Sequence, residues 1–132
     1  MPRDAEMTRF IKDDRFAGFI GLELVTVEPG HAVAQMKVEP HHLNGMGFVQ
    51  GGAIFTLADY AFAAAANSRG NPTLGINSAI SYFKTPKGKL LTAEAKEVSS
   101  TNRLCTYSVD VFDGDGGLIA RLTATGYIKR DK

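Results

Sequence analysis

Hydrophobic and polar residues alternate along much of the chain, with the period of two that is typical of half-buried β-strands. The segment 31–38 shows this most clearly, because apolar residues occupy every even position and mostly polar residues lie between them. Turn-forming residues separate this segment from others of the same character. The predicted strands cover residues 22–28, 31–38, 73–85, 89–99, 103–112 and 118–129.

One segment has helical character and is apolar on nearly every side. Residues 53–66 consist almost wholly of good or tolerable helix formers, and the segment 67–72 ends them with a glycine and then a proline. A helix without a polar face is predicted to be buried. A looser helical spacing predicts another helix over 4–19. We therefore expect an α+β fold in which an antiparallel sheet wraps around a central buried helix.

Composition and charge narrow the class of protein. The 132 residues, of which 44% are hydrophobic, are expected to form one domain over 1–132. Fifteen basic and fourteen acidic residues give a net charge of +1, which argues against nucleic acid or an anionic membrane as a partner. No apolar run approaches the roughly 20 residues of a membrane span. The charged start is unlike a secretory signal, so we expect a cytoplasmic location.

Patterns for metal and nucleotide binding are incomplete. Cys105 is the only cysteine, which excludes an internal disulfide, and its strand-like setting predicts a place in the core. The acidic turn 113–117 lacks the other ligands of a calcium loop, and the adjacent His41 and His42 have no carboxylate or cysteine at ligand spacing. The glycine-rich segment 45–52 lacks the lysine of a phosphate-binding loop. We expect no metal and no redox cofactor.

The functional hypothesis depends on the glycine-rich loop and one carboxylate in the apolar helix. A helix that begins at Gly51 and Gly52 presents free backbone N–H groups, which suit an anion or a polarised carbonyl oxygen. Asp59 is the only ionisable carboxylate in the helix, and its neighbours are apolar, so an unpartnered charge there is costly. A structural role for Asp59, as a cap or paired with a structural donor, is the alternative to a catalytic one.

The spacing of these features suggests a second copy of the chain. Gly51 and Asp59 are eight positions apart, or roughly 12 Å along a helix. One substrate carbonyl can hardly contact both positions. If they act together, Asp59 must therefore come from another protomer, and a two-fold symmetric dimer would contain two shared sites.

Several short motifs resemble those of the hotdog-fold thioesterases, in particular the phenylacetate-degradation (PaaI-type) acyl-CoA thioesterases. These motifs are Asn44-Gly45, Gly47, Gln50-Gly51-Gly52, Leu57-Ala58-Asp59 with the alanine-rich helix, and the strand Ile80 to Pro86. The resemblance implies a hotdog fold, dimers that often pair into tetramers, and hydrolysis of acyl- or aryl-CoA at the dimer interface. Coenzyme A would enter as part of the substrate, with no other cofactor.

The resemblance also implies roles for individual residues. The Gly51 N–H would polarise the thioester carbonyl, and Asp59 of the facing chain would activate water as a general base or attack directly. Asn44 matches an asparagine that helps to place water or substrate. The family usually has a histidine where this chain has Gln50, which donates hydrogen bonds but does not exchange a proton near neutral pH.

Further residues are expected to contact the substrate. Asn77 matches a position that often carries a small polar residue, and the aromatic side chains Phe55 and Tyr82 are candidates for a pocket, with core packing as the alternative. Lys84 and Arg103 lie near turns where family members meet CoA phosphates, with solvated surface charge as the alternative. The expected substrate-binding residues are Gly52, Asn77, Phe55, Tyr82, Lys84 and Arg103.

Two other functions fit the same pattern less well. The residue Gln50 makes a non-catalytic acyl-CoA-binding hotdog protein credible, although a pure binder has no need for the carboxylate of Asp59. A hotdog hydroxyacyl dehydratase expects a catalytic histidine, and the histidine nearest before the helix is His42. We therefore expect a cytoplasmic thioesterase acting on aryl-CoA or short- to medium-chain acyl-CoA, as a dimer or tetramer.

Overall fold

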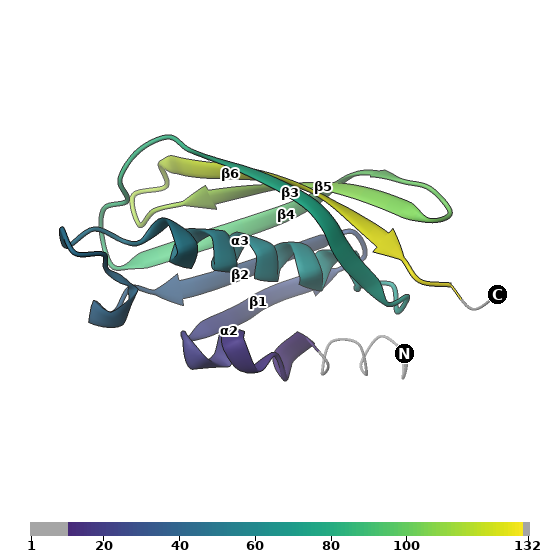
Figure 1. Ribbon diagram of the computed structural model, residues 1–132, viewed down its shortest axis with the longest axis horizontal. Helices are drawn as coiled ribbons and strands as arrows, with labels where there is room; N and C mark the ends of the chain where they lie inside the picture. Colours follow the sequence, from purple (N-terminus) through teal and green to yellow (C-terminus); the bar gives the residue numbers. More distant parts are fainter. Residues whose placement is uncertain (1–10, 131–132) are drawn as a thin grey trace.

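The computed structural model describes residues 11–130, in which a six-stranded antiparallel sheet wraps around a long helix (Figure 1). The elements are α2 (Arg15–Phe19), β1 (Leu22–Glu28), β2 (His31–Lys37), the 3-10 helix η1 (Pro40–His42), α3 (Gly51–Ala66), β3 (Thr73–Tyr82), β4 (Leu90–Ser100), β5 (Leu104–Phe112) and β6 (Leu118–Ile128). The strand order is β1-β2-β4-β5-β6-β3. The expected α+β arrangement is confirmed, with each predicted strand found within a few residues of its expected bounds.

Small side chains on the inner face of the sheet allow α3 to lie close to it. The β2 residues Ala32 and Ala34 are fully buried, and the β4 residues opposite them in the ladder, Ala95 and Ala93, are buried as well. Directly opposite residues of an antiparallel pair project from the same face. This face therefore packs against the buried side of α3, which includes Leu57.

Specific side chains set both ends of α3. The helix begins at Gly51, as the functional hypothesis expected, and the Gln50 side chain caps it by accepting a hydrogen bond from the Gly52 N–H. At the other end, the buried Asn67 side chain donates to the carbonyls of Ala63 and Thr73 and accepts from the Thr73 N–H. Asn67 thereby connects the end of α3 to the start of β3. No helix within residues 11–130 is long and apolar enough to cross a membrane.

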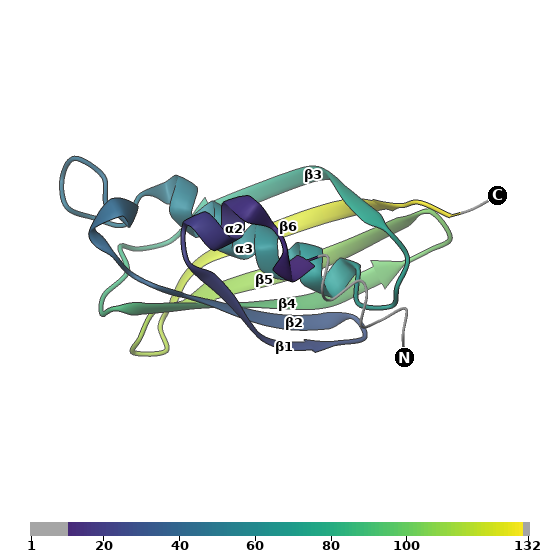
Figure 2. The ribbon, with the colours of Figure 1, turned by 90° about the horizontal axis from the view of Figure 1, so that it is seen from below.

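The N-terminal segment differs from the single helix expected over 4–19. Residues 1–10 lie outside the described part of the chain, and a new helix, α2, begins only at Arg15. The cause is Asp14, whose carboxylate accepts a hydrogen bond from the Ala17 N–H at 3.0 Å and caps α2. The short helix packs against β1 and α3, so that α3 lies between α2 and β3 (Figures 1 and 2).

Two expectations about single features are confirmed. Cys105 is buried and free, and burial raises the pKa of its thiol, so it belongs to the core as predicted. The acidic turn 113–117 joins β5 to β6 as a hairpin, in which the Asp113 carboxylate accepts hydrogen bonds from the N–H groups of Asp115, Gly117 and Lys87. Desolvation alone raises the pKa of Asp113, but these donors and the nearby Lys84 together lower it below its usual value.

Candidate active site

The first turn of α3 leaves one backbone donor available. The Gln50 side-chain Oε1 accepts from the Gly52 N–H at 2.7 Å, and the Gln50 carbonyl accepts from the Ala53 N–H at 2.9 Å. The Gly51 N–H has no hydrogen-bond partner among residues 11–130. Since this group also lies at the positive end of the helix dipole, it is suited to polarising an oxygen of a bound molecule.

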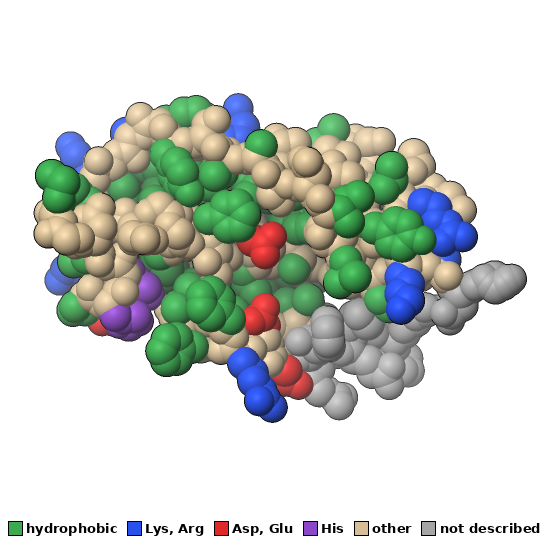
Figure 3. Space-filling model, viewed as in Figure 1, with side chains coloured by type: hydrophobic (Ala, Val, Ile, Leu, Met, Phe, Trp, Pro, Cys, Tyr) green, Lys and Arg blue, Asp and Glu red, His purple; other side chains and the backbone are tan. Residues whose placement is uncertain are grey.

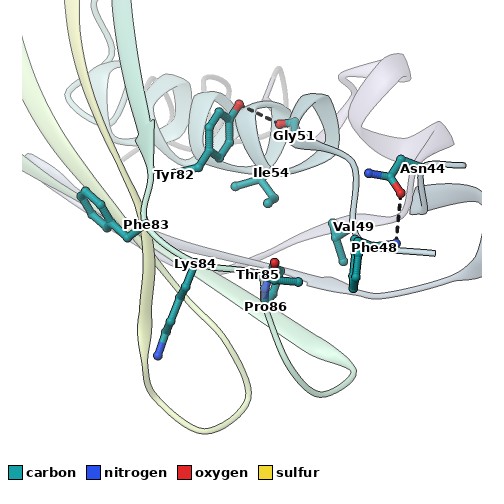
Figure 4. Close-up of a pocket in the computed structure, with 10 residues that line it drawn as sticks. All are labelled: Asn44, Phe48, Val49, Gly51, Ile54, Tyr82, Phe83, Lys84, Thr85 and Pro86. Atoms are coloured by element: carbon teal, nitrogen blue, oxygen red, sulfur yellow. Dashed lines mark hydrogen bonds between the residues drawn. The ribbon is translucent and has the colours of Figure 1, made fainter. Parts of the chain in front are cut away.

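Asn44 shapes the loop that leads into α3. Its Oδ1 accepts hydrogen bonds from the N–H groups of Met46 and Phe48, at 2.9 and 3.1 Å. Its side-chain nitrogen is left over as a donor and points away from these bonds, toward the start of α3 (Figure 4). Asn44 therefore holds the loop in shape while offering a donor on the same side as Gly51.

Tyr82, at the end of β3, is tied to the start of α3. Its hydroxyl donates to the Gly51 carbonyl at 3.0 Å, and burial raises the pKa of this phenol, which keeps it protonated as a donor. A Cβ added at Gly51 would lie 3.3 Å from the Tyr82 ring, which is tighter than an ordinary contact. A side chain at residue 51 would therefore require Tyr82 to shift by a few tenths of an ångström.

A cavity of about 350 Å³ lies between the start of α3 and the loop that joins β3 to β4 (Figure 4). We call it the β3-side cavity. Lys84 lines it and extends away from Gly51 in the view of Figure 4, close to the charge of Asp113. The cavity is lined by Asn44, Phe48, Val49, Gly51, Ile54, Tyr82, Phe83, Lys84, Thr85 and Pro86.

A second cavity, of about 430 Å³, lies on the other side of the same helix turn, against α2. We call it the α2-side cavity. Sequence patterns did not reveal it, because its walls come from residues far apart in the chain, of which only Gln50 and Gly52 belong to a motif. The lining residues are Phe16, Ile20, His41, His42, Leu43, Gln50, Gly52, Ala53 and Thr56.

His42 is a structural part of this wall. Its Nδ1 accepts from the Glu39 N–H at 2.9 Å, and its Nε2 lies 2.7 Å from the Ile20 carbonyl, which only accepts. Nε2 therefore carries the proton, and both ring nitrogens are engaged. Within residues 11–130, no group of three or more His, Cys, Asp and Glu side chains is placed to hold a metal ion.

Asp59 lies on the side of α3 that faces away from the sheet, where Gly52, Thr56 and Ala63 leave it in a half-buried position among small side chains. Its carboxylate forms no hydrogen bond or ion pair with any residue of the described range, so the structural donor required by the alternative role is missing there. Burial, and secondarily the charge of Asp14, raise the pKa of Asp59 above its usual value.

Two of the expected substrate-binding residues, Asn77 and Arg103, lie apart from Gly51 within one chain. Asn77 is paired with Thr125 on the outer face of the sheet, because a bulge at the preceding residue shifts the register of β3. Arg103 lies near the opposite end of β3 and donates to the Tyr127 hydroxyl. Phe55 is half-buried on α3 and lines neither cavity described above. Gly52, Tyr82 and Lys84 line one or the other cavity.

Gln50 is expected to contribute to stability through its cap. Gln50→Ala removes the acceptor of the Gly52 N–H and should lower the free energy of unfolding by ~1 kcal/mol, as measured by urea denaturation. Gln35→Ala is the matched control, because its amide bonds only to the exposed Glu23 side chain, and it should change the stability much less. Equal stability losses in the two variants would contradict the capping role.

Comparisons of the sequence and of the structure with known proteins point to the same protein family. The model described as thioesterase superfamily matches residues 46–120. A mutant of the phenylacetic acid degradation protein PaaI from Thermus thermophilus superposes with a TM-score of 0.83 and 35% identity, covering 88% of this chain and 100% of that chain. The acyl-coenzyme A thioesterase PaaI of Escherichia coli is 31% identical over 101 residues, which are 76% of this chain and 72% of that protein. Human acyl-coenzyme A thioesterase 13 is 32% identical over 119 residues, covering 87% and 84%.

The family match spans more than half of the 132 residues and includes α3 with Asp59, the strands β3 to β5 and the first residues of β6. The sheet wrapped around a central helix agrees with the structural match, so the expected hotdog fold of the PaaI type is confirmed. On these grounds the chain belongs to the thioesterase superfamily.

Proposed function

We propose that this protein hydrolyses acyl-CoA thioesters at a site shared between two protomers. The observation that carries the proposal is that α3 holds a backbone donor, the Gly51 N–H, and a carboxylate, Asp59, neither of which has a hydrogen-bond partner among residues 11–130. The relatives from Escherichia coli and human are named acyl-coenzyme A thioesterases, which supports this substrate class. Coenzyme A enters as part of the substrate, and no further cofactor is proposed.

The exposed surface around α3 supports a two-fold dimer. In the part of the chain that the structure describes, β3 pairs only with β6, so its other edge has unpaired backbone groups there. Its Leu74 and Ile76 side chains are 66% and 59% exposed. An open apolar edge strand is a template for pairing with another chain. On the face that carries α3, hydrophobic side chains are spread widely and basic ones lie toward the margins (Figure 3). The partner we propose is a second copy of this chain.

In the proposed site, the Gly51 N–H of one protomer binds the carbonyl oxygen of the thioester. Asp59 of the other protomer takes a proton from water as the water oxygen bonds to the carbonyl carbon. The C–S bond then breaks, the acid is released, and CoA leaves as a thiolate that takes up the proton. Direct attack by Asp59, which forms a mixed anhydride that water later hydrolyses, is the second route.

The test is to follow the loss of thioester absorbance with a panel of aryl-, short- and long-chain acyl-CoA substrates. Reading the thioester bond directly avoids a thiol reagent that Cys105 would also consume. We expect turnover of aryl-CoA or of short- to medium-chain acyl-CoA. If every CoA ester binds and none is hydrolysed, the protein is instead an acyl-CoA-binding hotdog protein, and the proposed catalytic function is wrong.

The pH dependence should follow the ionisation of Asp59. Activity requires the carboxylate, so kcat/KM should fall as the pH drops through the raised pKa of Asp59. Asp14→Asn removes the negative charge that contributes to this rise and retains a capping oxygen for α2, so the acidic limb should move to lower pH.

The matched control for this shift is Asp13→Asn, which removes a neighbouring charge that is not among the causes of the shift at Asp59. Its pH–rate profile should coincide with that of the wild type. Superimposable profiles for Asp14→Asn and the wild type would contradict the electrostatic coupling between Asp14 and Asp59.

A further inference from the structure

The α2-side cavity has no part in the bond-breaking chemistry described above. We propose that it binds the acyl group of the substrate, while the β3-side cavity receives the CoA arm, and that Ala53 and Phe16 limit the size of the acyl group. This assignment rests on the proposed function, because it divides a thioester substrate between the two cavities.

The two cavities differ in the charge of their linings, and the acyl group and the CoA part of a thioester differ in the same property. Among residues 11–130, no Lys, Arg, Asp or Glu lines the α2-side cavity, and Phe16, Leu43 and Ala53 make much of its wall apolar. The β3-side cavity also has apolar walls, but it differs in including the charged side chain of Lys84. An acyl group is apolar, whereas CoA carries phosphates that a lysine attracts, so charge complementarity assigns each part to one cavity.

The reacting bond would lie where the two cavities approach each other. Gly51 lines the β3-side cavity and Gly52 lines the α2-side cavity, so they flank the same helix turn. The Gly51 N–H lies at this junction and would face the carbonyl between the acyl group and the sulfur. A Cβ at Gly52 would lie 2.5 Å from the Gln50 Oε1, so the present sequence keeps side-chain bulk out of the junction.

The polar groups in the wall of the α2-side cavity are largely satisfied by the protein itself. The Thr56 hydroxyl donates to the Gly52 carbonyl at 2.7 Å, and the His42 Nε2–H donates to the Ile20 carbonyl. An apolar guest therefore buries few unsatisfied donors in this wall. The His42 bonds also hold η1 against the end of α2, so the cavity is formed before substrate binds.

The size of the α2-side cavity and the positions of its walls would limit the length of the acyl group that can bind. A volume of about 430 Å³ lies within the usual range for small-molecule sites. Ala53 lines it from α3, and Phe16 lines it from α2. Since leucine is as well accommodated in a helix as alanine, Ala53→Leu fills the cavity without breaking α3.

The test compares acyl-length profiles of two filling variants. Ala53→Leu should lower kcat/KM for hexanoyl-CoA and benzoyl-CoA by about tenfold or more and for acetyl-CoA by less than about threefold, since small changes in an apolar pocket discriminate on this scale. Thr85→Leu, in the β3-side cavity, is the matched control and should affect all three substrates equally. Phe16→Ala should raise the relative rate with longer chains and, because Phe16 is 60% exposed, should still fold.

A binding measurement separates this inference from the proposed function. By calorimetry, Ala53→Leu should weaken binding of the non-hydrolysable thioether S-hexyl-CoA about tenfold and leave the affinity for free CoA unchanged. If the wild type hydrolyses nothing, the proposed function fails, but this difference still supports the cavity assignment. Equal losses for all acyl lengths in Ala53→Leu, or an altered acyl profile in Thr85→Leu, would overturn the assignment.

Discussion

Asp59→Asn is expected to lower kcat by about a hundredfold or more for every acyl-CoA that the wild type hydrolyses. The substitution keeps the shape of the side chain and removes the negative charge that takes a proton from water or attacks the thioester. Substrate binding should change little, because in the proposed arrangement the two cavities beside the start of α3 hold the acyl group and the CoA arm, whereas Asp59 acts at the reacting bond.

Stability provides an internal check on this variant. Asp59 is half-buried without a partner in the described chain, and a group whose pKa is raised on folding stabilises the fold only at pH values below its folded pKa. Near neutral pH, Asp59→Asn should therefore be at least as stable as the wild type. This is the result expected for a charged residue that serves activity at a cost in folding stability. The control Asp115→Asn changes an exposed turn carboxylate and should retain full activity. Equal turnover by Asp59→Asn and the wild type would exclude Asp59 from the mechanism.

Ala63→Arg should abolish both dimerisation and activity. Ala63 lies one turn from Asp59 on the side of α3 that faces away from the sheet, and arginine is a good helix former, so the protomer should still fold. A long charged side chain at this small position would prevent close approach of a second protomer. Because the proposed site takes Gly51 from one protomer and Asp59 from the other, kcat/KM should fall about a hundredfold or more with dissociation.

The matched control is Thr123→Arg, which places the same side chain on the exposed outer face of β6. Sedimentation equilibrium should find dimers for the wild type and this control, and monomers for Ala63→Arg. A dimeric Ala63→Arg variant with normal activity would contradict the proposed arrangement of the two protomers around α3.

The strands were predictable because each buries one face of an open sheet, which imposes the period of two directly on the residue pattern. The residues 118–128 illustrate this, since Ala120, Leu122 and Ala124 are buried and Arg121 and Thr123 are exposed. The helix boundary near Asp14 was less predictable. It depends on a side-chain cap that bonds to a backbone N–H three residues away, and the spacing of hydrophobic residues does not reveal such a bond.

The candidate site was predictable only in part, for a similar reason. Gly51 and Asp59 could be identified as candidates from the sequence. A glycine pair at the start of an apolar helix and a single carboxylate within that helix are both unusual for a purely structural segment. The position of Asn77 depends on a bulge in β3, which shifts the register and turns the side chain to the outer face. The α2-side cavity depends on the packing of α2 against η1 and α3, and no local pattern records that packing.

Gln50 shows how the chain can depart from the usual family histidine and keep the helix start intact. Its Oε1 accepts from the Gly52 N–H, and the neighbouring Gly51 N–H is the donor that we propose for the substrate. Capping needs an acceptor and no titrating group, so the amide supports this geometry at any pH at which the protein is folded.

Subunit complementation tests the shared site most directly. Protomers carrying Asp59→Asn are mixed with protomers carrying Gly51→Val, whose side chain would collide with Tyr82 at the substrate donor, and the chains are exchanged by unfolding and refolding together. Each variant alone should be inactive. Random pairing gives heterodimers with one intact site each, so the mixture should recover roughly a quarter of the wild-type activity. A mixture that forms heterodimers but remains as inactive as its two components would contradict a site built from Gly51 of one protomer and Asp59 of the other.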